Sequence, residues 1–172
     1  VGDLVDGVKI ADLIESDRGG YEGYFEGVDA VVHLGYKRRG GEPIDHFHDE
    51  IDNVRMAYNV MRCAYEAGVR RVAVASSNHA ADWYEHALIH ERKMEVLDPY
   101  ELPLSDNFYG WAKATYEHIG FLFACGFPGF QSSSGVESHV SGRGASRKLE
   151  VVMVRIGAPR EIEVADLSLY PI

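Results

Sequence analysis

The chain has 172 residues, of which 46% are hydrophobic and 26% are charged. This length allows one domain with a sizeable core and is short for two, so we expect a single domain over residues 1–172. The formal net charge of −10 disfavours a nucleic-acid partner, because phosphate binding requires a basic face. No apolar run approaches the roughly 20 residues that span a bilayer, so we expect no membrane partner.

The cysteines and histidines predict neither a disulfide framework nor a metal site. The two cysteines, Cys63 and Cys125, lie far apart, which favours a reducing, cytoplasmic location. His86 and His90 have helical spacing, but no third ligand accompanies them. The chain begins with Val1 rather than Met and shows no secretory signal, so we expect a further segment upstream.

The first half of the chain predicts a helix, a strand and a long helix. Apolar residues at helical spacing predict an amphipathic helix over about residues 5–16. The short apolar run 30–34 is typical of a strand buried in a parallel sheet. A helical period then runs over about 44–67, and Gly68 stands where a helix C-cap is expected. We expect the acidic start of this helix, including Glu50, to be solvated.

The second half predicts two more strands around another helix. Residues 72–75 form an apolar run that leads into polar residues 76–79, and open α/β sheets place ligands at such strand ends. After the irregular stretch 80–106, the apolar spacing predicts a helix over 108–125. A third strand is predicted over 151–154.

The order of these elements predicts an α/β fold. Strand, helix, strand, helix, strand implies a Rossmann-like parallel sheet flanked by helices on both faces. The first βαβ portion of such a fold, with its glycine-rich turn, is lacking. Serine and glycine dominate about 127–147, and this composition predicts a flexible loop.

Tyr109 and Lys113 carry the clearest chemical signal. They stand four residues apart on the predicted helix, so both side chains project from one face, and an ammonium near a phenol favours the phenolate. Ser77, at the end of the preceding strand, is placed to hydrogen-bond the same substrate hydroxyl. The three residues together suit proton abstraction coupled to hydride transfer. A tyrosine and a lysine at this spacing are weak evidence alone, and the strand context gives them weight.

From Gly2 to about Gly157, the order of these motifs and the residues in them resemble the extended short-chain dehydrogenases/reductases, the NAD-dependent epimerase/dehydratase family. The resemblance implies a catalytic trio of Ser77, Tyr109 and Lys113 and an NAD cofactor, with NADP as the open alternative. It also implies a set of cofactor-binding residues, namely Asp3, Leu4, Leu34, Gly35, Asn53, Tyr109 and Lys113.

A narrower resemblance points to a substrate. Residues 75–79, taken with Tyr109-Gly110 and Arg155-Ile156-Gly157, are similar to the uronate dehydrogenases of this family. The similarity implies that Ser77, Asn78 and His79 contact a sugar acid. The expected activity is therefore NAD-dependent oxidation of a sugar or sugar-acid hydroxyl. For His79 the alternative is a loop histidine that caps the strand end.

Two other functions stay open at the level of sequence. The same trio serves nucleotide-sugar epimerases and dehydratases. The chain also fits a non-catalytic, truncated cofactor-binding fragment, because no glycine-rich phosphate-binding turn is present in it. The family commonly pairs through its two long helices, here about 44–67 and 108–125, so a homodimer is possible.

Overall fold

The computed structural model describes residues 9–126 and 148–157. Three earlier predictions therefore lie outside the described residues: the cofactor contacts of Asp3 and Leu4, the start of the first helix, and the loop at about 127–147.

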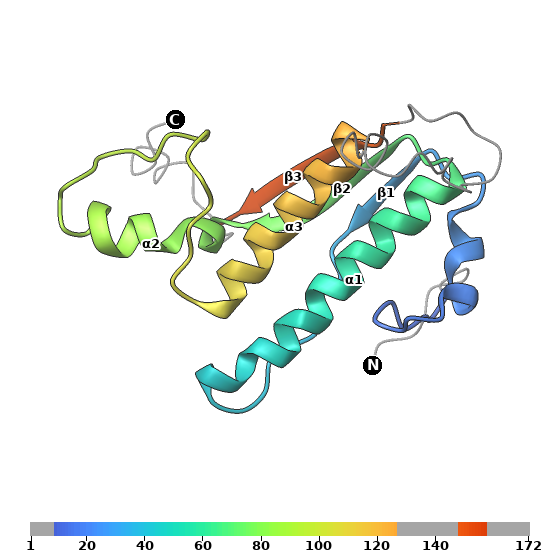
Figure 1. Cartoon of the computed structure of the whole chain (residues 1–172), viewed down its shortest axis with the longest axis horizontal. Coiled ribbons are helices and arrows are strands. Elements are labelled where there is room, and N and C mark those ends of the chain that lie inside the picture. Colours follow the sequence, from blue (N-terminus) through green and yellow to red (C-terminus); the bar gives the residue numbers. More distant parts are fainter. Residues whose placement is uncertain (1–8, 127–147, 158–172) are drawn as a thin grey trace, which may run out of the picture.

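Three parallel strands form the sheet, as predicted (Figure 1). They are β1 (Ala30–His33), β2 (Arg71–Ser77) and β3 (Glu150–Ile156), in the spatial order β1-β2-β3. Val72 lies beside Val31 of β1 and beside Val151 of β3, so the apolar runs align across the sheet. The chain crosses from each strand to the next through a long helix, which is the arrangement that parallel neighbours require.

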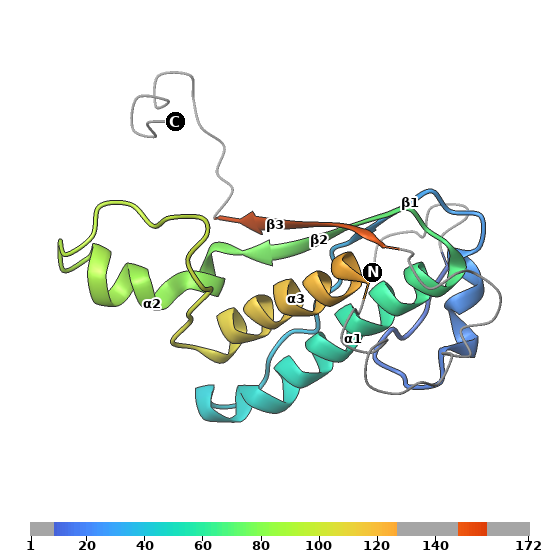
Figure 2. The ribbon, with the colours of Figure 1, turned by 45° about the horizontal axis from the view of Figure 1, so that its top comes forward.

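The two long helices are α1 (His46–Ala67) and α3 (Phe108–Cys125), and both predictions are confirmed. Figure 2 shows them side by side on one face of the sheet. The main core lies between the helices and that face, and at its centre are Ala57, Met61, Val72, Val74 and Tyr116. This layer places the first turn of α3 beside the end of β2.

The other face of the sheet differs from the prediction of helices on both faces. In the described part of the chain, Val32, Val152 and Val154 keep between 45% and 67% of their surface exposed on that side. These residues alternate with residues of the same strands that are partly or fully buried against the helices, as the pleat of a sheet requires. A shallow apolar hollow of about 150 Å³ lies there, lined by Val32, Leu34, Ala73, Val74, Ala75, Val154 and Ile156.

The helix predicted over about 5–16 is wrong for its described part, because residues 9–16 form no helix. Their main chain bonds to side chains instead. The amide of Asn59 donates to the carbonyls of Leu13 and Glu15, and Asp12 accepts from the N–H of Ile14. Ile10, one of the apolar residues in this stretch, is 80% exposed. Short 3₁₀ turns follow at Arg18–Gly20 (η1) and Glu22–Phe25 (η2).

The stretch 80–106 is more helical than predicted. After the 3₁₀ turn η4 (Asn78–Ala81), the chain continues through α2 (Asp82–Tyr84) and a π-helical turn, η5 (Glu85–Ile89). Another 3₁₀ turn, η3 (Pro43–Asp45), leads into α1. Among residues 9–126 and 148–157, no helix combines the length and the hydropathy that a membrane crossing needs.

Gly68 ends α1 in a left-handed conformation with φ of 89°, and its N–H donates to the carbonyl of Ala64. We expect Gly68→Ala to lower the free energy of unfolding by about 1–2 kcal/mol, because a Cβ is unfavourable at this φ. Urea denaturation measures the change. Gly23→Ala is the control, since Gly23 has an ordinary φ and open space where a Cβ would lie. An equal loss in both variants would contradict this explanation.

Candidate active site

Ser77 is the last residue of β2 and the cap of the turn that follows. Its side chain is buried, and its Oγ accepts a hydrogen bond from the N–H of His79 at 3.2 Å. The same hydroxyl lies 3.3 Å from Oδ1 of Asn78, to which it donates. These bonds turn the chain sharply at the strand end, so Ser77, Asn78 and His79 share one small loop.

The first turn of α3 is held against this loop. Asn107 caps the helix, since its Oδ1 accepts from the N–H of Gly110 at 2.9 Å. Gly110 lies so close to the loop that a Cβ there would overlap the carbonyl oxygen of His79. The rings of His79 and Tyr109 are consequently neighbours, with centroids 5.5 Å apart.

Lys113 is buried one turn further along α3, with 5% of its surface exposed. Its Nζ donates to the carbonyl of Ala75 in β2 at 2.8 Å. Three aromatic rings surround the ammonium, with centroids at 5.5 Å for Tyr36, 5.6 Å for Tyr109 and 4.6 Å for Tyr116. Burial lowers the pKa of Lys113 to about 8, and the charge of Glu50 acts against this shift.

His33 shows the electrostatic effect of this lysine from the end of β1. Burial, and then the charge of Lys113, lower the pKa of His33 to about 4. The ring is therefore neutral at physiological pH. Its Nε2 and the hydroxyl of Tyr116 are buried atoms without a hydrogen-bond partner among the described residues.

Asn53 fixes the loop after β1 rather than facing an open site. Its side-chain amide forms two hydrogen bonds with the main chain of Lys37. Oδ1 accepts from the N–H at 2.7 Å, and Nδ2 donates to the carbonyl at 3.0 Å. Nδ2 also lies 3.2 Å from Oε2 of Glu50. Both polar atoms of this side chain are thus engaged within the chain, and binding of cofactor by Asn53 stays a prediction.

The prediction that Glu50 is solvated is wrong, because its side chain is fully buried. Its Oε1 accepts from the hydroxyl of Tyr36 at 2.8 Å. Burial and this bond raise the pKa of Tyr36. The acidic start of α1 looked like a solvated surface because the sequence does not show that the loop after β1 folds back over it.

The residues present fit a nicotinamide nucleotide at the ends of β1 and β2. Lys113 uses one of its three N–H donors on Ala75, which leaves donors for ligand hydroxyls. Leu34, predicted to adjoin the cofactor, is 68% exposed at the end of β1. At Gly35 a Cβ would lie 2.9 Å from Sδ of Met56, so glycine lets the chain pass close to α1.

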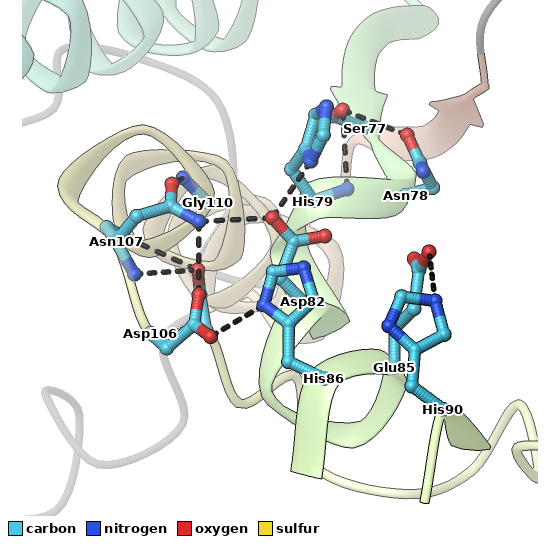
Figure 3. Close-up of polar contacts among 11 residues, drawn as sticks. Ser77, Asn78, His79, Asp82, Glu85, His86, His90, Asp106, Asn107 and Gly110 are labelled. Carbon is cyan, nitrogen blue, oxygen red and sulfur yellow. Dashed lines mark hydrogen bonds and ion pairs between the residues drawn. The ribbon is translucent and has the colours of Figure 1, made fainter. Parts of the chain in front are cut away.

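A polar network links His79 to the cap of α3 (Figure 3). Oδ2 of buried Asp82 lies 2.7 Å from Nδ1 of His79 and 2.9 Å from Nδ2 of Asn107. Because a carboxylate only accepts, Nδ1 of His79 carries the proton and Nε2 is left for a ligand. Asp82 therefore fixes both the tautomer of His79 and the position of the residue that caps α3.

Two further histidines lie beyond this network and pair with single carboxylates. His86 Nδ1 is 2.6 Å from Oδ2 of Asp106, which raises the pKa of His86, and His90 lies 3.4 Å from Glu85 (Figure 3). The part of the chain that the structure describes holds no group of three or more potential metal ligands.

Glu117 links α3 to two strands of the sheet. It accepts two hydrogen bonds from Arg155 of β3, at 2.8 and 2.7 Å, and one from Ser76 of β2 at 2.7 Å. Burial opposes ionisation, but these hydrogen bonds outweigh it and lower the pKa of Glu117. A charged pair with two parallel bonds fixes orientation strongly.

The fold thus brings together five of the predicted site residues: Ser77, Asn78, His79, Tyr109 and Lys113. The sequence reasoning missed those that hold them in place, namely Tyr36, Arg39, Glu50, Asp82 and Asn107. Only Asn107 gave a signal, as an asparagine directly before a predicted helix. Tyr36, Arg39 and Glu50 depend on contacts between segments that are distant in sequence, and so does the contact of Asp82 with Asn107.

Comparison with known proteins places this geometry in a wider context. The sequence pattern described as the NAD dependent epimerase/dehydratase family matches residues 6–166. The chain is 32% identical over 129 residues to the NAD-dependent glucose-6-phosphate dehydrogenase of Haloferax volcanii, covering 70% of this chain and 47% of that protein. It is 29% identical over 110 residues to the uronate dehydrogenase of Pseudomonas putida, covering 63% and 37%.

A solved structure is similar to this chain in fold as well as in sequence. A mutated uronate dehydrogenase superposes with a TM-score of 0.55 at 25% identity, covering 72% of this chain and 43% of that one. The chain spans less than half the length of the two curated relatives above.

Gly110 supplies a test of the contact between α3 and the loop after β2. We expect Gly110→Ala to destabilise the chain by at least about 2 kcal/mol, because the new methyl group overlaps backbone that cannot rotate away. Gly120→Ala on the same helix is the control, since its Cβ meets only the side-chain ends of Met153 and Val151. Thermal unfolding compares the two, and a larger loss for Gly120→Ala would refute this account.

The titration of Lys113 supplies a second test. With ¹³C-labelled lysine, we expect its Cε resonance, assigned with Lys113→Met, to titrate near pH 8 rather than near 10.5. The negative charge of Glu50 stabilises the ammonium of Lys113. Its removal in Glu50→Gln should therefore lower the pKa of Lys113 and move the titration to lower pH. Glu66→Gln, which removes a carboxylate that pairs with Arg18 instead, should leave it unchanged. A titration of Lys113 at or above 10.5 would exclude the buried environment.

Proposed function

Because the chain belongs to the NAD dependent epimerase/dehydratase family, we propose that it oxidises a hydroxyl of a sugar or sugar acid with NAD as acceptor. The observation that carries the proposal is the placement of Tyr109 between buried Lys113 and His79 of the loop that Ser77 caps. The relatives named above support the substrate class, since they are dehydrogenases of a uronate and of a sugar phosphate.

In the proposed reaction Tyr109 is the general base. It accepts the proton of the substrate hydroxyl, while Ser77 holds the same oxygen with a hydrogen bond. When bound, NAD supplies the acceptor for the hydride that leaves the adjacent carbon. The positive charge of Lys113 favours the phenolate, and its free donors are available to ligand hydroxyls.

The loop 77–79 completes the proposed site on the substrate side. The NH2 group of Asn78 can donate to a sugar hydroxyl or to a carboxylate, and Nε2 of His79 can accept a hydrogen bond from a sugar hydroxyl. His79 keeps its orientation because Asp82 holds its other nitrogen. This assignment makes His79 a substrate contact in preference to a simple cap of the strand end.

The second candidate function is epimerisation or dehydration of a nucleotide sugar, which the family description includes. The same base would then remove a proton without net formation of NADH. The two functions differ in a single measurement, the absorbance of NADH during turnover.

The test is NADH formation by the chain with glucuronate, galacturonate and glucose 6-phosphate. Replacing Tyr109 with Phe should lower kcat/KM by at least about 100-fold, because the phenol oxygen is the proton acceptor. Tyr58→Phe is the matched control, since it removes a hydroxyl from the outer side of α1. NAD binding, measured by calorimetry, should persist in both variants.

Three outcomes would overturn the proposal. One is equal activity of Tyr109→Phe and Tyr58→Phe. Another is sugar interconversion without NADH, which would favour the epimerase. The third is failure of the chain to bind NAD while it unfolds cooperatively, which would favour a non-catalytic fragment.

A further inference from the structure

Arg39 lies directly against the proposed catalytic tyrosine. Its Cζ is 5.1 Å from the centre of the Tyr109 ring, and it reaches this position from the loop that follows β1. His79 lies against the same ring at 5.5 Å.

The loop that carries Arg39 is fixed on both sides of it. Asn53 binds the N–H and the carbonyl of Lys37, and Asp49 accepts from the N–H of Gly40 at 2.9 Å. The ammonium of Lys37 is itself paired with Asp49 and Asp52. A residue between such anchors presents its side chain with little freedom to lose on binding.

Only one edge of the guanidinium has a protein partner among the described residues. Nε of Arg39 lies 3.6 Å from Oε1 of Glu50, and the structure gives its two terminal nitrogens no hydrogen bond there. The side chain is 37% exposed, whereas Glu50 is fully buried. Arginine has five N–H donors in a planar guanidinium, so an arginine whose Nε is occupied can still donate from both terminal nitrogens.

We propose that Arg39 is a substrate-binding residue that takes an anionic substituent of the sugar, a carboxylate or a phosphate, beside Tyr109. This inference rests on the proposed function and narrows its substrate class to anionic sugars. The terminal nitrogens of Arg39 form two parallel hydrogen bonds to two oxygens of the anion, a geometry that carboxylate and phosphate share.

Neutralisation of Glu50 alone does not account for Arg39. Glu50 already accepts hydrogen bonds from Tyr36 and Asn53, and its contact with Arg39 is longer than a hydrogen bond. A lysine would balance that charge equally well. Charge balance does not explain why a planar guanidinium is used here, with no hydrogen bond from its terminal nitrogens to the described residues.

The test compares the binding of three sugars to the chain by calorimetry in the absence of NAD, so that no oxidation accompanies binding. Glucuronate carries a carboxylate, glucose 6-phosphate carries a phosphate, and glucose is neutral. We expect Arg39→Gln to weaken binding of at least one anionic sugar by about 10- to 100-fold, as expected for loss of charged hydrogen bonds. Glucose binding should change by less than about threefold. Weaker binding of glucuronate would identify the anionic group as a carboxylate, and weaker binding of glucose 6-phosphate would identify it as a phosphate.

Arg38→Gln is the matched control, because Arg38 is the exposed neighbour in the same loop and its loss changes the charge equally. It should leave the affinities within about threefold. If Arg39→Gln unfolds the chain, Arg39→Lys carries the test, because it keeps a positive charge beside Glu50 but lacks the planar guanidinium. The ratio of anionic to neutral affinity should still fall in that variant.

The inference is overturned if the Arg39 variants weaken glucose and the anionic sugars equally, or weaken none of them. It is also overturned if the unaltered chain binds no anionic sugar. Because binding is measured without NADH formation, its outcome is separate from that of the proposed oxidation. If Arg39→Gln leaves the dehydrogenase activity unchanged, this inference is wrong, whereas the proposed function is still supported.

Discussion

The buried ammonium of Lys113 is the constraint on which the rest of the site depends. Transfer of a charged amine from water into a protein interior is costly unless it gains hydrogen bonds and favourable charges. Here a main-chain carbonyl of β2 and the faces of three aromatic rings replace part of the lost hydration. Two of those rings, Tyr109 and Tyr116, come from α3 itself, and the third comes from the loop after β1. The helix, the strand end and the loop therefore have to close together.

The sequence predicted those parts of the fold that depend on local patterns. Period-3.6 spacing identified α1 and α3, and short apolar runs identified the three strands, because a buried element repeats one local rule along its length. The proposed trio was also found locally, since Tyr109 and Lys113 share a helix face and Ser77 ends a strand. For these residues, topology alone forces proximity once the strands are parallel.

What could not be predicted depends on contacts between distant segments. The false helix at 9–16 had suitable apolar spacing, but Asn59 of α1 takes two of its carbonyls. Glu50 had the neighbours of a surface acid, yet Tyr36 and the loop after β1 cover it. Asp82 and Asn107 are 25 residues apart and meet only because Gly110 lets α3 approach η4. No local pattern encodes such pairings.

The hydroxyl of Ser77 carries a consequence for the direction of proton movement. One lone pair of its oxygen is committed to the N–H of His79, and its hydrogen points to Asn78 across a long 3.3 Å contact. That hydrogen is the one easily redirected to a bound sugar oxygen. Under the proposed chemistry, the sugar oxygen then accepts from the serine and can donate only to Tyr109. The geometry at the end of β2 would thus set Ser77 as the hydrogen-bond donor and Tyr109 as the acceptor before any bond in the substrate changes.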